Sequence, residues 1–335
     1  MPEVSVLLPV RNGEAWLREC LDSLLCQTLA DIEIVAVCNG SDDASPRILD
    51  EVAASDARLR VVQVPAVGIV GALNVALREA RSELIARMDA DDIANPLRLA
   101  LQARALAESQ DVDILATRVR LVSQPGMQNE GMQAYVEWSN NLVDHDAIVR
   151  DLFVESPLVH PSVMMRRSRL ESLGGYRDFD GPEDYDLWLR AHRRGRRFAK
   201  LPAVLLSWRD RPERLTRQDP RYSPEAFLAL KLEALQAGPL GEGRSVVVWG
   251  AGPIGKSWAR ALAARGVDLA AFVEVDPDKI GQRIHNVPVV EVSGATAFRG
   301  ALHLAAVGDH EARARIREAA ADLGLADGRD MIAVA

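Results

Sequence analysis

The sequence predicts an α/β protein of two domains, in which a helix-covered, largely parallel sheet is followed by a smaller domain of the same class. Three observations support this. Strand-like and helix-like segments alternate with short connections from the N-terminus onward, which is typical of parallel sheets. The 335 residues are enough for two domains, or three, at roughly 100–200 residues each. After a glycine-rich stretch at 236–244, a new apolar strand pattern begins.

Apolar runs in the first hundred residues predict buried strands, and segments with apolar residues at helical spacing predict the helices between them. The run VSVLLPV (4–10) is apolar throughout and stops at Asn12-Gly13, as expected of a strand buried on both faces. The other predicted strands are 32–37, 59–64 and 84–92, and the predicted helices are 14–29, 46–54 and 68–80.

The later part of the chain is less regular. Residues 122–133 predict a loop, and 182–195 predict a helix. Domain boundaries fall in flexible segments rich in glycine, proline and polar residues. We therefore expect a first domain at 1–235, a linker at 236–244 and a second domain at 245–335.

The composition excludes several classes of protein. Hydrophobic residues make up 48% and charged residues 26%, as in ordinary globular domains. The net charge of −8 argues against bulk attraction to nucleic acid or anionic lipid, so we expect no nucleic-acid partner and at most peripheral membrane contact. No apolar run approaches the roughly 18 residues of a spanning helix, and the N-terminus lacks a basic signal-peptide front. Three cysteines without a CxxC pattern predict no disulfide framework and no zinc site, and we expect a cytoplasmic protein.

The acidic sequence MDADD (88–92) ends the strand predicted at 84–92. On a strand, Asp89 and Asp91 would project to the same side at its carboxyl end, where open α/β sheets bind ligands. Two carboxylates there suit Mg²⁺ or Mn²⁺. The alternative, which the pattern alone leaves equally open, is a solvated acidic turn in which Asp92 caps the helix that follows Pro96.

Several motifs occur in order along the first two thirds of the chain. They are PVRNGEAWLRECLDSLLCQT, CNGSDD, GIVGALNVALREARSELIARMDADDIANPLRLALQ, HPSVMMRRSRLESLGGY and PEDYDLWLRAHRRG. Together they resemble the family 2 glycosyltransferases of the GT-A fold, over about residues 3–217. Because the order and spacing match, this resemblance is more specific than the DxD pattern alone. It implies a GT-A nucleotide-sugar-binding domain.

The resemblance implies a divalent cation, Mn²⁺ or Mg²⁺, held mainly by Asp91, with Asp89 contacting the ribose or sharing the metal. The family's base-reading Asp-Asp-Gly-Ser-like turn is replaced here by Cys38-Asn39-Gly40-Ser41. That departure leaves the base open, although a UDP-sugar is favoured. Asn39-Gly40 is also an ordinary tight turn, and both roles are compatible. The donor-binding residues that the resemblance implies are Pro9, Asn12, Glu14, Asn39, Asn74, Arg87, Asp89 and Arg211.

The segment PEDYDLWLRAH (182–192) begins with a proline and acidic residues. In the family, the aspartate of the Glu-Asp pair deprotonates the acceptor hydroxyl, so the resemblance assigns the base to Asp184 with Glu183 as its neighbour. With one base and no enzyme nucleophile, the transfer would invert the configuration. The alternative is that both acids only stabilise the start of a helix.

Three further residues have two interpretations each. Arg211 stands where the family often has a metal-ligating histidine, and because arginine cannot ligate a metal, it either leaves the metal to Asp91 or binds diphosphate as a fork. His160 is an acceptor contact or a turn residue. Trp188 is a sugar-stacking platform or a core residue.

The C-terminal segment VVVWGAGPIGKSWARALAARG (246–266) contains Gly250, Gly252 and Gly255 in the GxGxxG pattern of dinucleotide folds, and it also fits the P-loop pattern. The next predicted strand ends near Glu274, where a dinucleotide fold places its ribose acid, so we favour a Rossmann-like domain. This domain resembles those attached to sugar acyltransferases and methyltransferases. It either binds a nucleotide at these four residues or serves in packing and assembly.

The sequence therefore predicts an inverting, metal-dependent glycosyltransferase of the hexosyltransferase type. Its partners would be a nucleotide-sugar donor and a saccharide or glycolipid acceptor in glycan assembly, and a homo-oligomer is left open. The alternatives are a catalytically decayed nucleotide-sugar-binding or scaffold protein and a sugar nucleotidylyltransferase. The first strand is not followed by the glycine-rich, arginine-containing loop that the latter would need.

Overall fold

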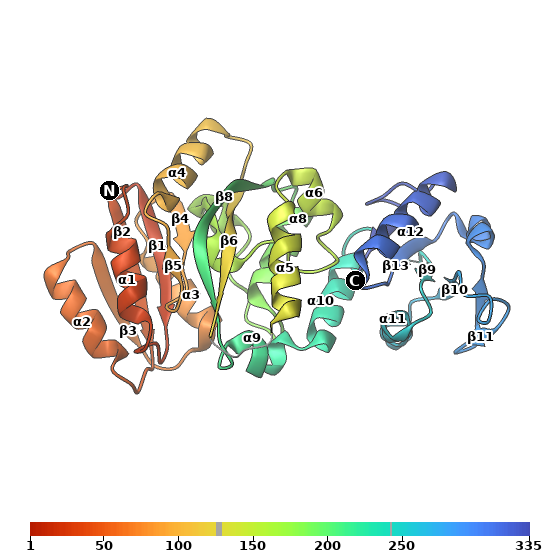
Figure 1. Cartoon of the computed structure of the whole chain (residues 1–335), viewed down its shortest axis with the longest axis horizontal. Coiled ribbons are helices and arrows are strands. Elements are labelled where there is room, and N and C mark those ends of the chain that lie inside the picture. Colours follow the sequence, from red (N-terminus) through yellow and green to blue (C-terminus); the bar gives the residue numbers. More distant parts are fainter. Residues whose placement is uncertain (125–128, 242) are drawn as a thin grey trace. The chain divides into compact units, whose positions relative to one another are not determined.

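The computed structural model describes residues 1–124, 129–241 and 243–335, and it divides into two compact units (Figure 1). Unit 1 comprises Met1–Ile148 and Pro157–Asp219, and unit 2 comprises Val149–Ser156 and Pro220–Ala335. The domain limits at 235 and 245 stay a prediction, and the linker includes residue 242, which lies outside the described residues. None of the described helices has the length and apolar character needed to cross a membrane.

The described residues of unit 1 build one mixed sheet in the order β3-β2-β1-β4-β7-β6-β8-β5. Strands β1 to β4 pair in parallel, as their apolar sequences predict, whereas β7 is antiparallel to both of its neighbours. The strands are β1 (Val4–Val10), β2 (Ile32–Asn39), β3 (Leu59–Val64), β4 (Leu84–Arg87), β5 (Ile93–Ala94), β6 (Ile114–Ser123), β7 (Met164–Arg166) and β8 (Phe198–Asp210).

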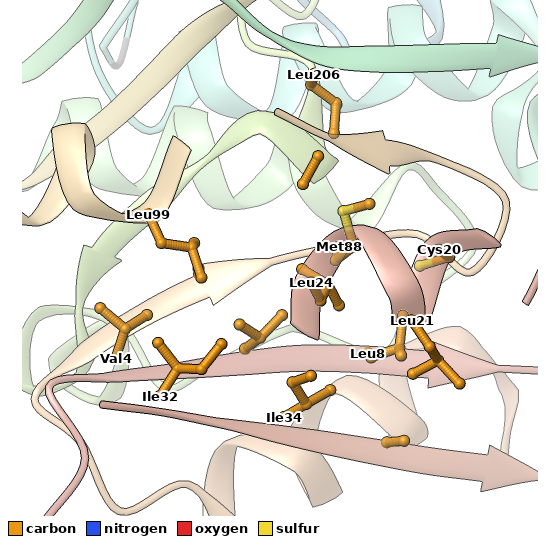
Figure 2. Packing of buried hydrophobic residues seen from close by; sticks show 14 of the residues in the cluster. Val4, Leu8, Cys20, Leu21, Leu24, Ile32, Ile34, Met88, Leu99 and Leu206 are labelled. Carbon is orange, nitrogen blue, oxygen red and sulfur yellow. The ribbon is translucent and has the colours of Figure 1, made fainter. Parts of the chain in front are cut away.

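The longer helices of the first half of unit 1 bury an apolar stripe. In α1, Leu17, Cys20, Leu21 and Leu24 recur at helical spacing and are all buried. Figure 2 shows Leu21 and Leu24 packed over Leu8 of β1 and Ile34 of β2. The helices are α1 (Leu17–Leu25), α2 (Ser45–Ser55), α3 (Gly68–Glu79), α4 (Arg98–Glu108), α5 (Glu130–Asn141), α6 (His145–Arg150, which crosses into unit 2), α7 (Arg167–Ser172), α8 (Glu183–Arg193) and α9 (Leu215–Gln218), with a 3₁₀ turn at His160–Ser162.

Two predictions about the residues after β4 are wrong in detail. The strand predicted at 84–92 ends at Arg87, and residues 89–92 form a turn in which the Asp92 N–H donates to the Asp89 carbonyl at 3.3 Å. The next helix begins at Arg98, and the Asn95 side chain accepts the Leu97 N–H there, so Asp92 is not its cap. A turn, and not strand alternation, therefore gathers the aspartates.

The loop predicted at 122–133 is wrong at both ends. Strand β6 continues to Ser123 because it pairs with β8 as far as Asp210, and helix α5 begins at Glu130. Residues 125–128 of the predicted loop lie outside the described residues. The remaining predicted helices and strands of the first half are confirmed to within a few residues at their ends.

Unit 2 contains a second α/β sheet, in the order β11-β12-β10-β9-β13-β14. Strands β12, β10, β9, β13 and β14 pair in parallel, which is the 3-2-1-4-5 order of a doubly wound sheet. The elements are α10 (Pro224–Gln236), β9 (Val246–Trp249), α11 (Pro253–Ala264), β10 (Leu269–Val273), β11 (Arg283–Ile284), β12 (Val287–Val290), β13 (Leu302–Ala305), α12 (His310–Asp322) and β14 (Met331–Ala333), with 3₁₀ turns at Pro220–Tyr222 and Val292–Phe298. The predicted α/β class is therefore confirmed for both units.

Candidate active site

The turn after β4 concentrates negative charge at the carboxyl end of the sheet. Asp89, Asp91 and Asp92 each offer a carboxylate oxygen, and these three oxygens lie within 4.8 Å of one another. Arginines hold two of them: Arg87 pairs with Asp89, and the Arg211 Nε lies 2.7 Å from Asp91 Oδ2. Asp92 Oδ1 accepts the backbone N–H of Arg209 at 2.8 Å. Its Oδ2 is buried and has no hydrogen-bond partner in the described part of the chain.

This turn fits a divalent cation. Carboxylate oxygens are the ligands that Mg²⁺ and Mn²⁺ prefer, and three of them converge here. Burial, together with the charges of Asp91 and Asp89, raises the pKa of Asp92 well above its usual value. A buried carboxylate with one unpartnered oxygen is unfavourable by itself, and a bound cation would relieve it.

A buried thiol lies under the same turn. Cys20 donates from its Sγ to the Asp89 carbonyl at 3.2 Å. Burial, followed by the charges of Asp92, Asp91 and Asp89, raises the pKa of Cys20. Because the thiolate is the nucleophilic form, this cysteine is unsuited to covalent catalysis.

The ends of β1 and β2 are tied together by the predicted donor-binding residues. Asn12 has a φ of 51° and accepts the Asp42 N–H through Oδ1 at 3.0 Å. Glu14 accepts the Ala44 N–H at 2.9 Å, and its own N–H donates to Asp43. Pro9 is buried within β1. Asn12 and Glu14 are exposed at the edge where parallel α/β sheets bind ligands.

The side chain of Asn39 closes the turn after β2. Its Oδ1 accepts the Val67 N–H at 2.8 Å, and its Nδ2 donates to the Gly68 carbonyl at 3.1 Å. Gly40 has a φ of 62°, and a Cβ there would lie 2.7 Å from the Ala66 nitrogen. The tight-turn role of Asn39-Gly40 is therefore confirmed, and base recognition stays a prediction.

Arg87, at the end of β4, connects the acidic turn with the start of α8. It is only 4% exposed and pairs with Asp89. Burial alone would lower the pKa of Arg87, but the charge of Asp89 and its hydrogen bond, together with the charge of Glu183, raise it. Carboxylates from two separate segments therefore act on its guanidinium.

The first turn of α8 carries three acids with different surroundings. Glu183 is buried, and its Oε1 lies 3.8 Å from His160 Nδ1. Asp186 is also buried and pairs with Arg190 and Arg177. Asp184, by contrast, is only partly buried, and its Oδ1 accepts the Tyr185 N–H at 2.7 Å. Among these three, Asp184 is the most accessible to solvent.

The two predicted acceptor residues are buried. Trp188 is 0% exposed and packs edge-on against His160, with ring centroids 5.8 Å apart. His160 is 5% exposed and hydrogen-bonds the Tyr176 hydroxyl at 3.1 Å. Burial and then the charge of Arg87 lower the pKa of His160 well below its usual value. These contacts correspond to the core interpretation that the sequence also allowed for both residues.

The glycine loop of unit 2 has the geometry that its pattern predicts. Gly250 has a φ of 99°, and a Cβ at Gly255 would lie 1.8 Å from the Gly250 carbonyl oxygen. A Cβ at Gly252 would meet nothing within 4 Å. Glu274 follows β10, accepts the Ala251 N–H at 2.9 Å and pairs with Lys279 at 3.0 Å.

The structure also identifies residues that the sequence interpretation missed. Asp92 joins the acidic cluster, and Tyr176 joins the polar group around His160. Arg98 is 0% exposed and donates to the Arg87 carbonyl at 2.7 Å, and burial lowers its pKa to about 10. The third aspartate was visible in MDADD, but an arginine on the apolar face of α4 carries no sequence signal.

The sheet, the acidic turn and the acid-bearing helix start define a nucleotide-sugar transferase fold of the GT-A class. Residues 1–349 of TarS from S. aureus, solved in complex with UDP-GlcNAc, match it with a TM-score of 0.57 and 22% identity, covering 72% of this chain and 68% of that one. The likeness to the UDP complex of the same protein has a TM-score of 0.54.

The family model for Glycosyl transferase family 2 matches residues 5–174, half of the chain. The chain is 33% identical over 211 residues to the amylovoran biosynthesis glycosyltransferase AmsE of Erwinia amylovora, covering 61% of this chain and 75% of AmsE. It is 29% identical over 190 residues to the O-antigen biosynthesis glycosyltransferase WbnJ of Escherichia coli, covering 56% and 70%. The chain belongs to glycosyl transferase family 2, and the predicted enzyme class, a glycosyltransferase, is confirmed.

Proposed function

We propose that this glycosyltransferase is inverting and metal-dependent, and that it moves a sugar from a nucleoside-diphosphate sugar, with UDP favoured, to a hydroxyl of a saccharide or glycolipid. One observation carries the proposal. Buried Arg87 pairs with Asp89 of the acidic turn, and the charge of Glu183 at the start of α8 acts on it as well. A donor diphosphate at the first segment and an acceptor hydroxyl at the second would thus meet in one site.

Asp89, Asp91 and Asp92 would hold the cation, Mn²⁺ or Mg²⁺. When bound, such an ion stabilises the negative charge that develops on a departing diphosphate. Asn12, Glu14 and Asn39, at the ends of β1 and β2, would border the nucleoside, and Asn39 Oδ1 would have to exchange the Val67 N–H for the base.

Asp184 would take the proton of the acceptor hydroxyl. Its place in the first turn of α8 favours the ionised form that a base requires, because the helix N-terminus is electropositive. Asp186 and Glu183 are buried, and Cys20 is a protonated thiol. A single displacement with Asp184 as base inverts the anomeric configuration.

The relatives support a role in surface polysaccharide assembly, since AmsE and WbnJ are named for amylovoran and O-antigen biosynthesis. We propose the same class of acceptor here, and a cytoplasmic location where nucleotide sugars are available. Retention of the carboxylates in both segments argues against a decayed scaffold protein.

We also propose that unit 2 binds a nucleotide at Gly250, Gly252, Gly255 and Glu274. The 3-2-1-4-5 strand order and the open space at Gly252 favour it. Ribose binding at Glu274 would require Lys279 to move aside. Gly252→Ala tests this role: its φ of −78° accepts alanine, so the fold should persist while the phosphate approach is blocked.

A thermal-shift panel of nucleoside diphosphates, nucleotide sugars and NAD(P), with and without Mn²⁺, tests these proposals together. Ligands that bind the folded state raise the midpoint according to affinity and concentration. We expect a manganese-dependent shift with one nucleotide that Asp91→Ala abolishes. A shift that survives Asp91→Ala but is lost in Gly252→Ala would assign the ligand to unit 2. No shift with any nucleotide sugar would overturn the transferase site and leave the scaffold alternative.

A further inference from the structure

Arg211 contacts the very carboxylate that the proposed cation needs. It follows the last residue of β8, and its Nε lies 2.7 Å from Asp91 Oδ2. The Arg211 side chain is 24% exposed and that of Asp91 is 13% exposed, so the pair is largely shielded from solvent. A second, weaker neighbour is Glu213, at 4.0 Å and 62% exposed.

A guanidinium that donates to a carboxylate oxygen occupies one of its lone pairs and neutralises part of its charge, so that oxygen is a weaker ligand for a metal ion. Arginine stays protonated at all accessible pH values and has only donors, so it cannot share the ion as a ligand. A divalent cation at the acidic turn therefore competes with Arg211 for Asp91 Oδ2. Two positive charges this close also repel each other.

A diphosphate removes the conflict, because it supplies oxygens for both cations. Guanidinium groups bind phosphates as bidentate partners, and divalent cations in such sites share phosphate oxygens with one or two carboxylates. With a diphosphate present, Arg211 has another anionic partner, and Asp91 becomes free for the metal.

The other arginines around the turn are held differently. Arg87 is buried against Asp89. Arg209 donates to the Asp91 carbonyl and to Glu19, with its guanidinium 4.1 Å from the Trp16 ring. Arg211 also pairs with a carboxylate of the cluster, but its side chain is 24% exposed against 4% for Arg87, and it lies in the segment that follows β8. Of the two arginines that pair with cluster carboxylates, Arg211 is therefore the less confined.

We propose that Arg211 couples the two ligands: it keeps divalent cations weakly bound in the nucleotide-free protein and strengthens their binding when a nucleoside diphosphate is present. This inference rests on the proposed donor site. It adds that the cation and nucleotide bind cooperatively, and by linkage each raises the affinity of the other by the same factor.

The test measures Mn²⁺ binding to the full chain by the loss of the free-ion EPR signal, with and without saturating UDP. Wild type is compared with Arg211→Gln and with Arg211→Lys, which retains a charge but not the fork. Arg18→Gln is the matched control, because it breaks an arginine–carboxylate pair of 2.6 Å, with Glu51, outside the acidic cluster. Thermal unfolding of each variant confirms that it is folded.

We expect Arg211→Gln to bind Mn²⁺ about tenfold more tightly than wild type without UDP, the effect of removing one charge-assisted hydrogen bond from Asp91. The enhancement by UDP should shrink by a similar or larger factor, with Arg211→Lys between the two and Arg18→Gln like wild type. Unchanged or weaker Mn²⁺ binding in Arg211→Gln, with the UDP enhancement intact, overturns the coupling role alone. Absence of Mn²⁺ and UDP binding in wild type, Arg211→Gln and Arg211→Lys overturns both the donor site and this inference.

Discussion

The side chain of Asn74 satisfies both backbone polar groups of Tyr176. Its Nδ2 donates to the Tyr176 carbonyl at 2.8 Å, and its Oδ1 accepts the Tyr176 N–H at 3.0 Å. Helix α3 is thereby tied to a segment 102 residues further along the chain. Gly175, with a φ of 69°, allows this approach, since a Cβ there would lie 2.8 Å from Asn74 Oδ1. The tie places the Tyr176 hydroxyl against His160, beside the start of α8.

Asn74→Ala should therefore destabilise the protein by about 2 kcal/mol, because two largely buried backbone groups lose their partners. Urea unfolding measures the loss. Nucleotide affinity of the folded variant distinguishes this role from the predicted donor contact. An affinity equal to that of wild type supports a purely structural role, whereas a tenfold weaker affinity without loss of stability would reverse that conclusion.

Replacing Arg87 should lower the free energy of unfolding by more than replacing Asn74 does. Arg87→Met leaves Asp89 without its partner, and removing one partner from a buried ion pair costs about 3 kcal/mol. We also expect weaker nucleotide binding, because Asp89 is no longer oriented. Arg81→Met is the control, because Arg81 is exposed and its ion pair with Glu33 is long, at 4.0 Å. Similar unfolding midpoints for the two variants would contradict a central role for Arg87.

The parallel half of the unit 1 sheet was predictable because buried parallel strands are continuously apolar. The runs that became β1, β2 and β3 needed no information beyond their own sequences. Strand β6 was not predictable to its end, because its last residues extend only through pairing with β8, more than eighty residues away. Pairing between distant segments overrides local preference there.

The candidate site residues were likewise predictable only where the signal is local in the sequence. Asp89, Asp91 and Asp184 could be found because their motifs are local and ordered along the chain. The surroundings of each acid could not be predicted from the sequence. Asp186 is two residues from Asp184, yet it is buried against Arg190 and Arg177. Likewise, Trp188 has the residue type of a sugar platform but lies wholly in the core. Only tertiary packing separates an accessible side chain from a buried one of the same type.

Asp184→Asn should keep donor affinity while lowering turnover by roughly 10²-fold or more, the scale of a lost general base. Asparagine can still accept the Tyr185 N–H, so the helix start should remain intact. Two quantities are measured for each variant: kcat for sugar transfer and the dissociation constant of the nucleoside diphosphate. Asp186→Asn is the comparison on the same helix, and it should instead lower stability, since it leaves Arg190 and Arg177 with a neutral partner. Equal loss of donor binding and turnover in Asp184→Asn would count against its role as the base.

Two buried lysines predict how stability depends on pH. Lys200 of unit 1 is 3% exposed and donates to the Ser139 hydroxyl and the Pro157 carbonyl, at 3.0 and 3.1 Å. Burial, with a contribution from Arg118, lowers its pKa to about 7. In unit 2, Lys231 donates to the Val154 carbonyl at 2.7 Å, and burial lowers its pKa to about 8. The hydrogen-bond partners of both ammonium groups are neutral oxygens, which stabilise a positive charge less than a carboxylate would, although the charge of Glu155 partly offsets the effect of burial on Lys231.

The direction in which stability changes with pH follows from the number of protons that each state binds. Between pH 7 and about 10, unfolded lysine holds a proton that folded Lys200 has released, so the unfolded state binds more protons and stability rises with pH. The slope is at most ~1.4 kcal/mol per pH unit for each such group. Urea unfolding of the full chain from pH 7 to 9.5 should show this rise in wild type and in Lys256→Met, an exposed control on α11. Lys200→Met should lessen the rise, since one of the two titrating lysines is gone. The contrary result is a wild-type stability that falls from pH 7 to 9.5 and does not differ in Lys200→Met. It would mean that Lys200 stays charged in the folded protein and that its carbonyl partners suffice to hold the ammonium.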